Sequence, residues 1–133
     1  MASATIEEAL HYKLVNEATI VAEVVTRIFW REAPQRTKFP YVSYFTVSNP
    51  YGAIAFGRTD AGNARIQINV YHKNKVEALR IGDIVRDTLD QYHGTVDGVV
   101  IAYITCTGTH CLKMPDEDIY MATFDALIVY EDI

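Results

Sequence analysis

The chain has 133 residues, of which 50% are hydrophobic and 22% are charged, and its formal net charge is −5. This balance excludes an intrinsically disordered chain, which would be poorer in apolar residues and richer in net charge. No cluster of Lys or Arg stands out, so general nucleic-acid binding through counterion release is disfavoured. The length predicts a single domain spanning residues 1–133.

The sequence shows no targeting or membrane signal. Residues 1–10 lack the basic and apolar regions of a signal peptide, and no apolar run approaches the roughly 18 residues that span a membrane. We therefore expect synthesis in a cytoplasm and no membrane association. In that compartment the two cysteines, Cys106 and Cys111, are expected to stay reduced.

The first predicted element is a helix over residues 5–17. Thr5 and Glu8 have the spacing of a capping box, and an apolar stripe with helical spacing follows them. The next segment stays open. Residues 18–25 fit either a second short helix or the run-in to a strand at residues 26–30, because periodicity does not decide such short apolar runs.

A loop and a strand come next. Pro34 and Pro40 each lack an amide donor and bias the preceding residue away from helix, so residues 31–40 are predicted to be a loop. Residues 41–48 are rich in aromatic and β-branched side chains, which is typical of a strand.

The longest break in the pattern is residues 49–63, with three Gly, one Pro, two Asn and one Asp. A loop of this length in a compact domain is usually functional or disordered. Its apolar residues need cover, so the loop either folds back on its own domain or orders against a partner, and we favour the partner. Its candidate interface residues are Ile54, Phe56, Arg58 and Asp60.

Residues 64–71 alternate between apolar and polar side chains, which predicts a strand with one face on a core. The polar face is open to two interpretations that we weigh equally: an ordinary solvated sheet face, or a subunit or partner interface. Arg and Tyr are enriched in interface cores, which supports the second. The candidate interface residues on this face are Arg65, Gln67, Asn69 and Tyr71.

A helix over residues 75–92 follows directly. Asn74 and Glu77 are spaced as an N-cap and its partner three residues on, and a broad apolar stripe continues to Leu89. Gly94 is placed to end this helix in a left-handed conformation.

Two further strands complete the chain. Residues 98–107 are apolar on both faces, which predicts a central strand, and residues 119–130 alternate. The order of elements predicts an α+β fold: a mostly antiparallel four- to five-stranded sheet with two main helices packed on one face.

No catalytic, cofactor-binding or metal-binding residues emerge from the sequence. Cys106, His110 and Cys111 supply only half of a zinc-ligand pattern. Asp116 and Asp118 fit a solvated turn, and neither a nucleophile elbow nor a phosphate-binding glycine motif is present. We therefore expect neither an enzyme nor a cofactor.

Several segments taken together resemble a known family. Residues 33–35 (Ala-Pro-Gln) lead to residues 39–44 (Phe-Pro-Tyr-Val-Ser-Tyr), and a glycine-containing loop leads to residues 64–71. A helix with apolar positions follows, and the chain closes on residues 118–120 (Asp-Ile-Tyr) and Phe124. In order and spacing this chain resembles the small tail-completion proteins of long-tailed bacteriophages, also called tail terminator or tail-to-head joining proteins.

The resemblance implies a virion structural protein that forms a homo-oligomeric ring, usually a hexamer, at the head-proximal end of the tail tube. The ring would stop tube polymerisation and join the tail to the head, with the tail tube protein and a head connector or completion protein as partners. It would let DNA pass through its lumen without specific binding. The chain would be made in the host bacterial cytoplasm and end in the tail of the virion.

Two alternatives remain beside this interpretation. One is another neck component, such as a head-completion protein or a tail-tube adaptor. The other is a small-molecule-binding α+β domain, which a large apolar pocket with convergent polar groups would favour.

Position 69 is Asn, where the resemblance leads us to expect an acidic residue at least as often.

Overall fold

The fold is built on one sheet, which has seven strands in the part of the chain that the structure describes. The computed structural model describes residues 6–25, 27–31, 33–34, 36–48, 61–114 and 118–132. The strands are β1 (Ile28–Trp30), β2 (Tyr41–Ser48), β3 (Ala61–His72), β4 (Gly94–Val96), β5 (Val99–Cys106), β6 (His110–Lys113) and β7 (Tyr120–Asp132).

The α+β class is confirmed, but four to five strands was too few. Strands β1, β4 and β6 have only three or four residues each. An alternation that short leaves no signal in a sequence, so β4 and β6 were not predicted. Strand β1 lies within the strand considered at residues 26–30.

The strand order is β1-β2-β3-β7-β5-β4, and β6 also pairs with β7. Strand β1 runs parallel to β2, whereas the other pairs are antiparallel. Strands β5 and β6 pair with successive stretches of β7, so they follow one another along the same side of that strand. The sheet is thus mostly antiparallel, as predicted, with one parallel pair at the β1 edge.

Strand β5 lies inside the sheet, but only one of its faces is buried. Tyr103 and Thr105 are exposed on the side away from the core. A register shift between Ile101 and Tyr103 breaks the alternation, and this is why the segment seemed apolar on both faces.

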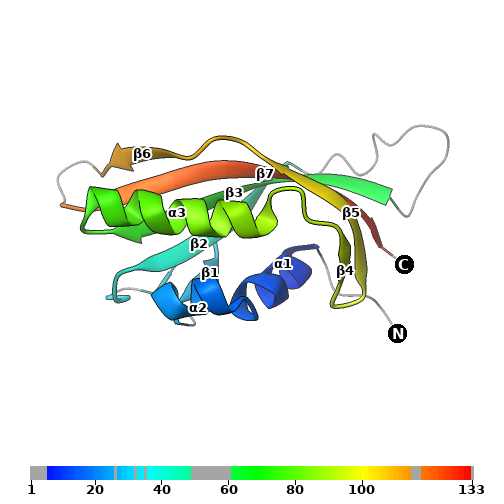
Figure 1. Ribbon diagram of the computed structural model, residues 1–133, viewed down its shortest axis with the longest axis horizontal. Helices are drawn as coiled ribbons and strands as arrows, with labels where there is room; N and C mark the ends of the chain where they lie inside the picture. Colours follow the sequence, from blue (N-terminus) through cyan, green and yellow to red (C-terminus); the bar gives the residue numbers. More distant parts are fainter. Residues whose placement is uncertain are drawn as a thin grey trace.

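Three helices lie on the same side of the sheet (Figure 1). They are α1 (Ile6–Val15), α2 (Ala18–Val24) and α3 (Lys75–Leu89). The two main helices were predicted, and α2 decides the open question of residues 18–25 in favour of a helix. Thr5, half of the predicted capping box, lies outside the described residues.

The predicted start of helix α3 is confirmed, and its predicted end is wrong. The Asn74 side chain accepts a hydrogen bond from the Glu77 amide at 3.2 Å, as an N-cap does. The helix ends at Leu89 rather than near residue 92.

Gly94 does not cap this helix. The left-handed residue after the helix is Gln91, with φ 63°, and its amide donates to the Ile104 carbonyl at 2.7 Å. This bond ties the chain to β5 directly after the helix, so Gly94 instead opens strand β4.

The core fills the space between the helices and the inner face of the sheet. Along β3 the predicted inner face is confirmed, because all four of its apolar side chains are 0% exposed. The largest fully buried side chains are Tyr44, Phe124, Leu10, Leu14, Ile20, Ile66, Ile68, Ile81, Leu89, Ile104, Ile128 and Val24.

Gly82 sets how closely α3 approaches the sheet. A Cβ atom at this position would lie 3.1 Å from the Ala122 Cβ and 3.2 Å from the Thr109 Cγ2. The absence of a side chain therefore lets the middle of the helix lie against β7. Among the described helices, none combines the length and the hydropathy of a membrane span.

Candidate protein interface

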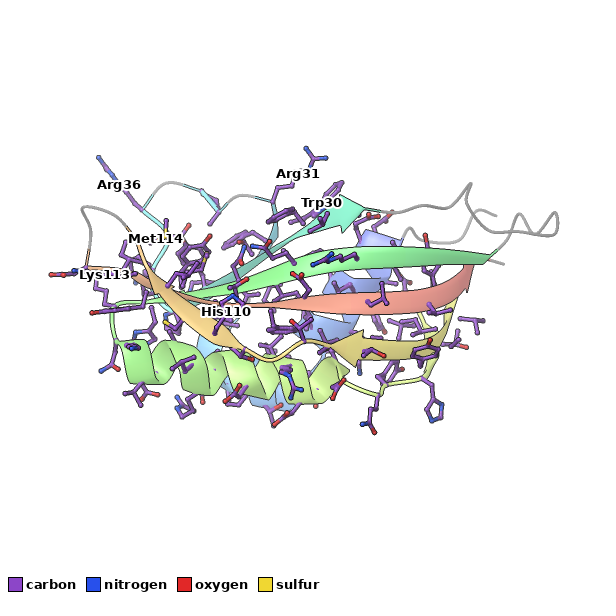
Figure 2. All side chains as sticks on the ribbon, turned by 90° about the horizontal axis from the view of Figure 1, so that it is seen from above. Trp30, Arg31, Arg36, His110, Lys113 and Met114 are labelled. Atoms are coloured by element: carbon purple, nitrogen blue, oxygen red, sulfur yellow. The ribbon has the colours of Figure 1, made fainter. Side chains whose placement is uncertain are left out.

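The face of the sheet opposite the helices, here called the open face, is formed by the outward residues of β2, β3, β5, β6 and β7. Figure 2 looks down on the molecule from this side. Arg65, Gln67, Asn69 and Tyr71 are paired with outward residues of β2 and β7, so they share this face. The predicted stripe of four polar side chains is therefore continuous along β3.

The four stripe residues differ in exposure. The Arg65 side chain is 54% exposed, and Gln67 and Tyr71 are half-buried. Asn69 is only 4% exposed, although no described helix covers it. Asn69 therefore belongs to the interior of the protein and not to a solvated surface.

Asn69 is buried because of its neighbours in the sheet. It stands in register with Ser43 on β2 and Thr123 on β7, and both are also buried. These three short side chains form a row between two rows of longer ones. The Asn69 Oδ1 accepts a hydrogen bond from the Gln67 Nε2 at 2.9 Å, which satisfies a polar atom that has lost contact with water.

One end of the open face is aromatic. The rings of Tyr41 and Tyr71 stack across β2 and β3 at 4.8 Å between centroids. Phe39 lies 5.4 Å from Tyr41, and Phe29 meets the same ring edge-on at 6.3 Å. The Lys73 Nζ lies 5.7 Å from the centroid of Phe39, so a cation borders the cluster.

The other end of the open face is held by an ion pair. The Arg65 Nη2 and Nε donate to the Asp125 Oδ2 at 2.6 and 3.1 Å. The Asp125 backbone amide also donates to the Thr107 side-chain hydroxyl at 2.9 Å. Arg65 is therefore engaged within its own chain, and about half of its side chain still faces solvent.

Large apolar side chains remain uncovered on the open face. Tyr103 on β5, Leu112 on β6 and Leu127 on β7 are 49%, 51% and 44% exposed. Val47, in the irregularity between β2 and β3, is 48% exposed. A hollow of about 240 Å³ opens beside Leu112, and Gln67 and His110 also line it.

The predicted interface residues of the long loop, Ile54, Phe56, Arg58 and Asp60, lie outside the described residues. The structure therefore brings together only the four residues of β3.

The histidines and cysteines form no metal site in the described ranges. Cys106 and Cys111 are free thiols. Burial, reinforced by Asp90, raises the pKa of the Cys106 thiol to about 12, so this group stays protonated at neutral pH. Burial also raises the pKa of Cys111. Burial outweighs the nearby cation in both cases, Arg86 for Cys106 and Lys75 for Cys111, so neither thiol has the lowered pKa of a reactive cysteine.

The sequence matches the family described as Tail completion protein gp17 over residues 8–131. The chain belongs to this family. It is therefore a structural component of a phage tail or neck rather than an enzyme. The resemblance drawn from the order and spacing of segments is confirmed.

Solved structures share the fold of this tail completion protein. A chain in the virion of a native gene transfer agent (GTA) particle superimposes with a TM-score of 0.75 at 16% identity, covering 95% of this chain and 94% of that chain. A second structure, which carries no descriptive name, gives a TM-score of 0.53 at 15% identity over 96% and 93% of the two chains. At these identities the likeness shows the fold alone. A comparison with curated proteins found no match.

Sequence reasoning missed one surface of this tail completion protein. A groove of about 750 Å³ runs between α1 and β1 and reaches Asp97 in the turn between β4 and β5. Its walls include Tyr12 and Trp30, which are each 50% exposed. No local pattern indicates this groove, because its residues come from four separate segments: α1, β1 with the loop after it, β2, and the turn at Asp97.

Proposed function

We propose that this tail completion protein forms a closed ring, six-membered as its family resemblance implies, at the head-proximal end of the tail tube. There it stops tube polymerisation and joins the tail to the head. The open face of the sheet carries the proposal. It combines uncovered Leu112, Leu127 and Tyr103 with polar side chains that are already bonded to one another.

The composition of the open face suits contact between proteins. Burying half-exposed apolar side chains against a partner is favourable, because it removes apolar surface from water. The Asn69–Gln67 bond and the Arg65–Asp125 pair satisfy polar atoms within the chain, so a partner does not have to compensate them. A closed ring uses a heterologous contact, in which one patch meets a different patch on the next copy.

The similarity in fold to a chain of the gene transfer agent virion supports a role in a phage-like particle. Within such a particle the partners would be further copies of this chain, the tail tube protein, and a head connector or completion protein. DNA would pass through the lumen without specific binding, consistent with a net charge of −5. Synthesis in the bacterial cytoplasm precedes assembly in this proposal.

The groove between α1 and β1 has the volume of a small-molecule pocket. However, such pockets enclose most of the ligand's surface, whereas two of this groove's aromatic wall residues are half exposed. Membership of a virion structural family also favours a protein ligand over a metabolite.

Electron microscopy of the purified protein, alone and with growing tail tubes, tests the proposal. We expect rings in the free protein or a cap of extra density at one tube end, with shorter tubes as protein is added. Tubes of unchanged length without end density would contradict termination. A cap that attaches to heads but leaves tube length unchanged would instead identify a different neck component.

A further inference from the structure

The groove between α1 and β1 has mostly apolar walls and three carboxylates in its lining. It is here called the acidic groove and is defined by Glu7, Glu8, Tyr12, Trp30 and Asp97. Its floor includes Tyr44, which is 1% exposed, and its walls carry the two half-exposed aromatic rings. A cleft of about 750 Å³ with aromatic walls is large enough to admit several side chains of a partner.

The acidic groove is already formed in the single chain. The Tyr44 hydroxyl donates to the Glu7 carbonyl at 3.0 Å, and the Thr46 hydroxyl donates to the Glu7 carboxylate at 2.6 Å. These two bonds fix the first turn of α1 on β2. On the other wall, His11 Nε2 lies 3.2 Å from the Ile28 carbonyl oxygen, which joins α1 to β1. Because the groove is already ordered, binding a partner there costs little further conformational entropy.

The charge of the groove favours a cationic partner. Three carboxylates, those of Glu7, Glu8 and Asp97, belong to its lining, and no Lys or Arg does among the described residues. Arg31 lies at the rim, where its guanidinium carbon is 5.1 Å from the centroid of the Trp30 ring. An ammonium group near carboxylates and aromatic faces gains both ion-pair and cation–π stabilisation.

The same chain carries a complementary surface, here called the basic end and defined by Arg36, Lys38, Phe39, Tyr41 and Lys73. The three cationic side chains are exposed. None of them has an ion pair among the described residues, whereas Arg65 and Arg80 do. Figure 2 shows Arg36 projecting away from the body of the molecule. The lysine beside the Phe39 ring thus presents a cation next to an aromatic surface, as the groove requires.

We propose that the basic end of one copy docks in the acidic groove of the next. This inference rests on the proposed ring, to which it assigns the two different patches that a heterologous contact needs. The lysine at position 73 lies against Phe39 of its own chain. Docking brings that cation to the carboxylates of the neighbour and covers Tyr12 and Trp30.

Charge reversal tests the docking. Lys73→Glu reverses one of the three cations of the basic end, and Glu8→Lys reverses one of the three carboxylates of the groove. Each variant alone should therefore self-associate at least about tenfold more weakly than the natural chain. An equimolar mixture of the two variants should recover association, because the reversed end of one variant meets the reversed groove of the other, and the two unchanged patches still fit each other. The double variant should recover it as well. Sedimentation velocity measures the association.

Lys13→Glu is the matched control. It changes the charge by the same amount on α1, but Lys13 faces the Tyr92 ring and does not line the groove. We expect this control to associate as the natural chain does. Thermal midpoints of all variants show whether each chain folds. Recovery in the mixture cannot come from a change in the stability of either variant, because each chain is the same as when tested alone.

Several outcomes would overturn the docking. It is wrong if the single reversals associate as strongly as the natural chain, if the mixture associates no better than the variants alone, or if the natural chain does not associate even on tubes. If both reversals still cap tubes normally, the ring function stands and the docking fails. If the mixture recovers only closed pairs, the docking stands and the ring fails.

Discussion

The two faces of the sheet differ sharply in exposure, even between adjacent residues of one strand. On β7, Ile128 points to the helices and is 0% exposed, whereas Leu127 points to the open face and is 44% exposed. The inner face is covered by α1, α2 and α3 of the same chain (Figure 1). The open face has no such cover among the described elements.

The open face is nevertheless ordered by its own contacts. The Tyr41–Tyr71 stack, the Asn69–Gln67 bond and the Arg65–Asp125 pair cross between neighbouring strands or link residues along one of them. The comparison indicates that folding depends mainly on the inner face, while the open face leaves apolar side chains available for a partner. Variants that separate stability from assembly test this division.

The largest expected effect is on the inner face. Ile128→Ala removes methyl groups from a fully buried site and leaves a cavity, so we expect a loss of about 2–5 kcal/mol in the free energy of unfolding. The thermal midpoint should fall by on the order of 10 °C. Urea unfolding followed by circular dichroism measures the free energy, and a thermal scan measures the midpoint.

Leu127→Ala is the matched variant on the open face. We expect its unfolding free energy to change by no more than about 1 kcal/mol, because the side chain is already half exposed. Its assembly into rings or tube caps should weaken. Equal losses of stability in the two variants would remove the proposed division between the faces.

A smaller effect is expected where α3 meets the sheet. Gly82→Ala places a Cβ within 3.1 Å of the Ala122 Cβ, and overpacking of this kind costs about 1–3 kcal/mol. The gain in helix propensity offsets up to about 1 kcal/mol of that. We therefore expect a net loss of about 1–2 kcal/mol in unfolding free energy, measured in urea.

Asp83→Ala is the control for this substitution, because it lies next to Gly82 on the exposed side of α3. It should leave stability nearly unchanged. If Gly82→Ala proves stabilising, the helix has room to move away from β7, and the inner face is less tightly packed than the structure indicates.

The elements that sequence patterns predicted are those whose signal is local. The alternation of residues 64–71 and the Asn74–Glu77 cap each depend on neighbours within a few residues, and both are confirmed. The segment at residues 18–25 stayed open because seven helical residues span only about two turns.

The features that sequence patterns missed depend on contacts between distant segments. Asn69 is polar and alternates with apolar residues, so nothing local indicates that Ser43 and Thr123 will bury it. The acidic groove joins α1, β1 and the turn at Asp97.

The N-cap of α3 gives a third test with a moderate effect. Asn74→Ala removes the acceptor for the Glu77 amide and should cost about 1 kcal/mol in unfolding free energy. Asn74→Asp keeps an acceptor oxygen and should restore most of the loss. Hydrogen exchange of the first turn of α3 localises the effect. A loss that Asp does not restore would mean that Asn74 acts through another contact.

The smallest stability effect belongs to the Arg65–Asp125 pair. Arg65 is 54% exposed and Asp125 is 24% exposed, so solvent screens much of their attraction. Arg65→Gln should therefore cost no more than about 1 kcal/mol in unfolding free energy. Arg65→Glu should behave similarly in stability while placing a second carboxylate beside Asp125. Both variants should weaken ring or cap formation, because they change a charge within the open face.

Arg80→Gln is the control that distinguishes an effect specific to Arg65 from a general effect of losing an arginine. Arg80 is 46% exposed and pairs with Glu23 on α2 and Glu77 on α3, so it is an ion-paired arginine on the helix side. We expect Arg80→Gln to assemble normally, as judged by ring and cap counts in electron micrographs. If both arginine variants assemble equally well, Arg65 serves only its own chain. If Arg65→Gln alone fails to assemble while its thermal midpoint stays near that of the natural chain, the open face is a contact surface.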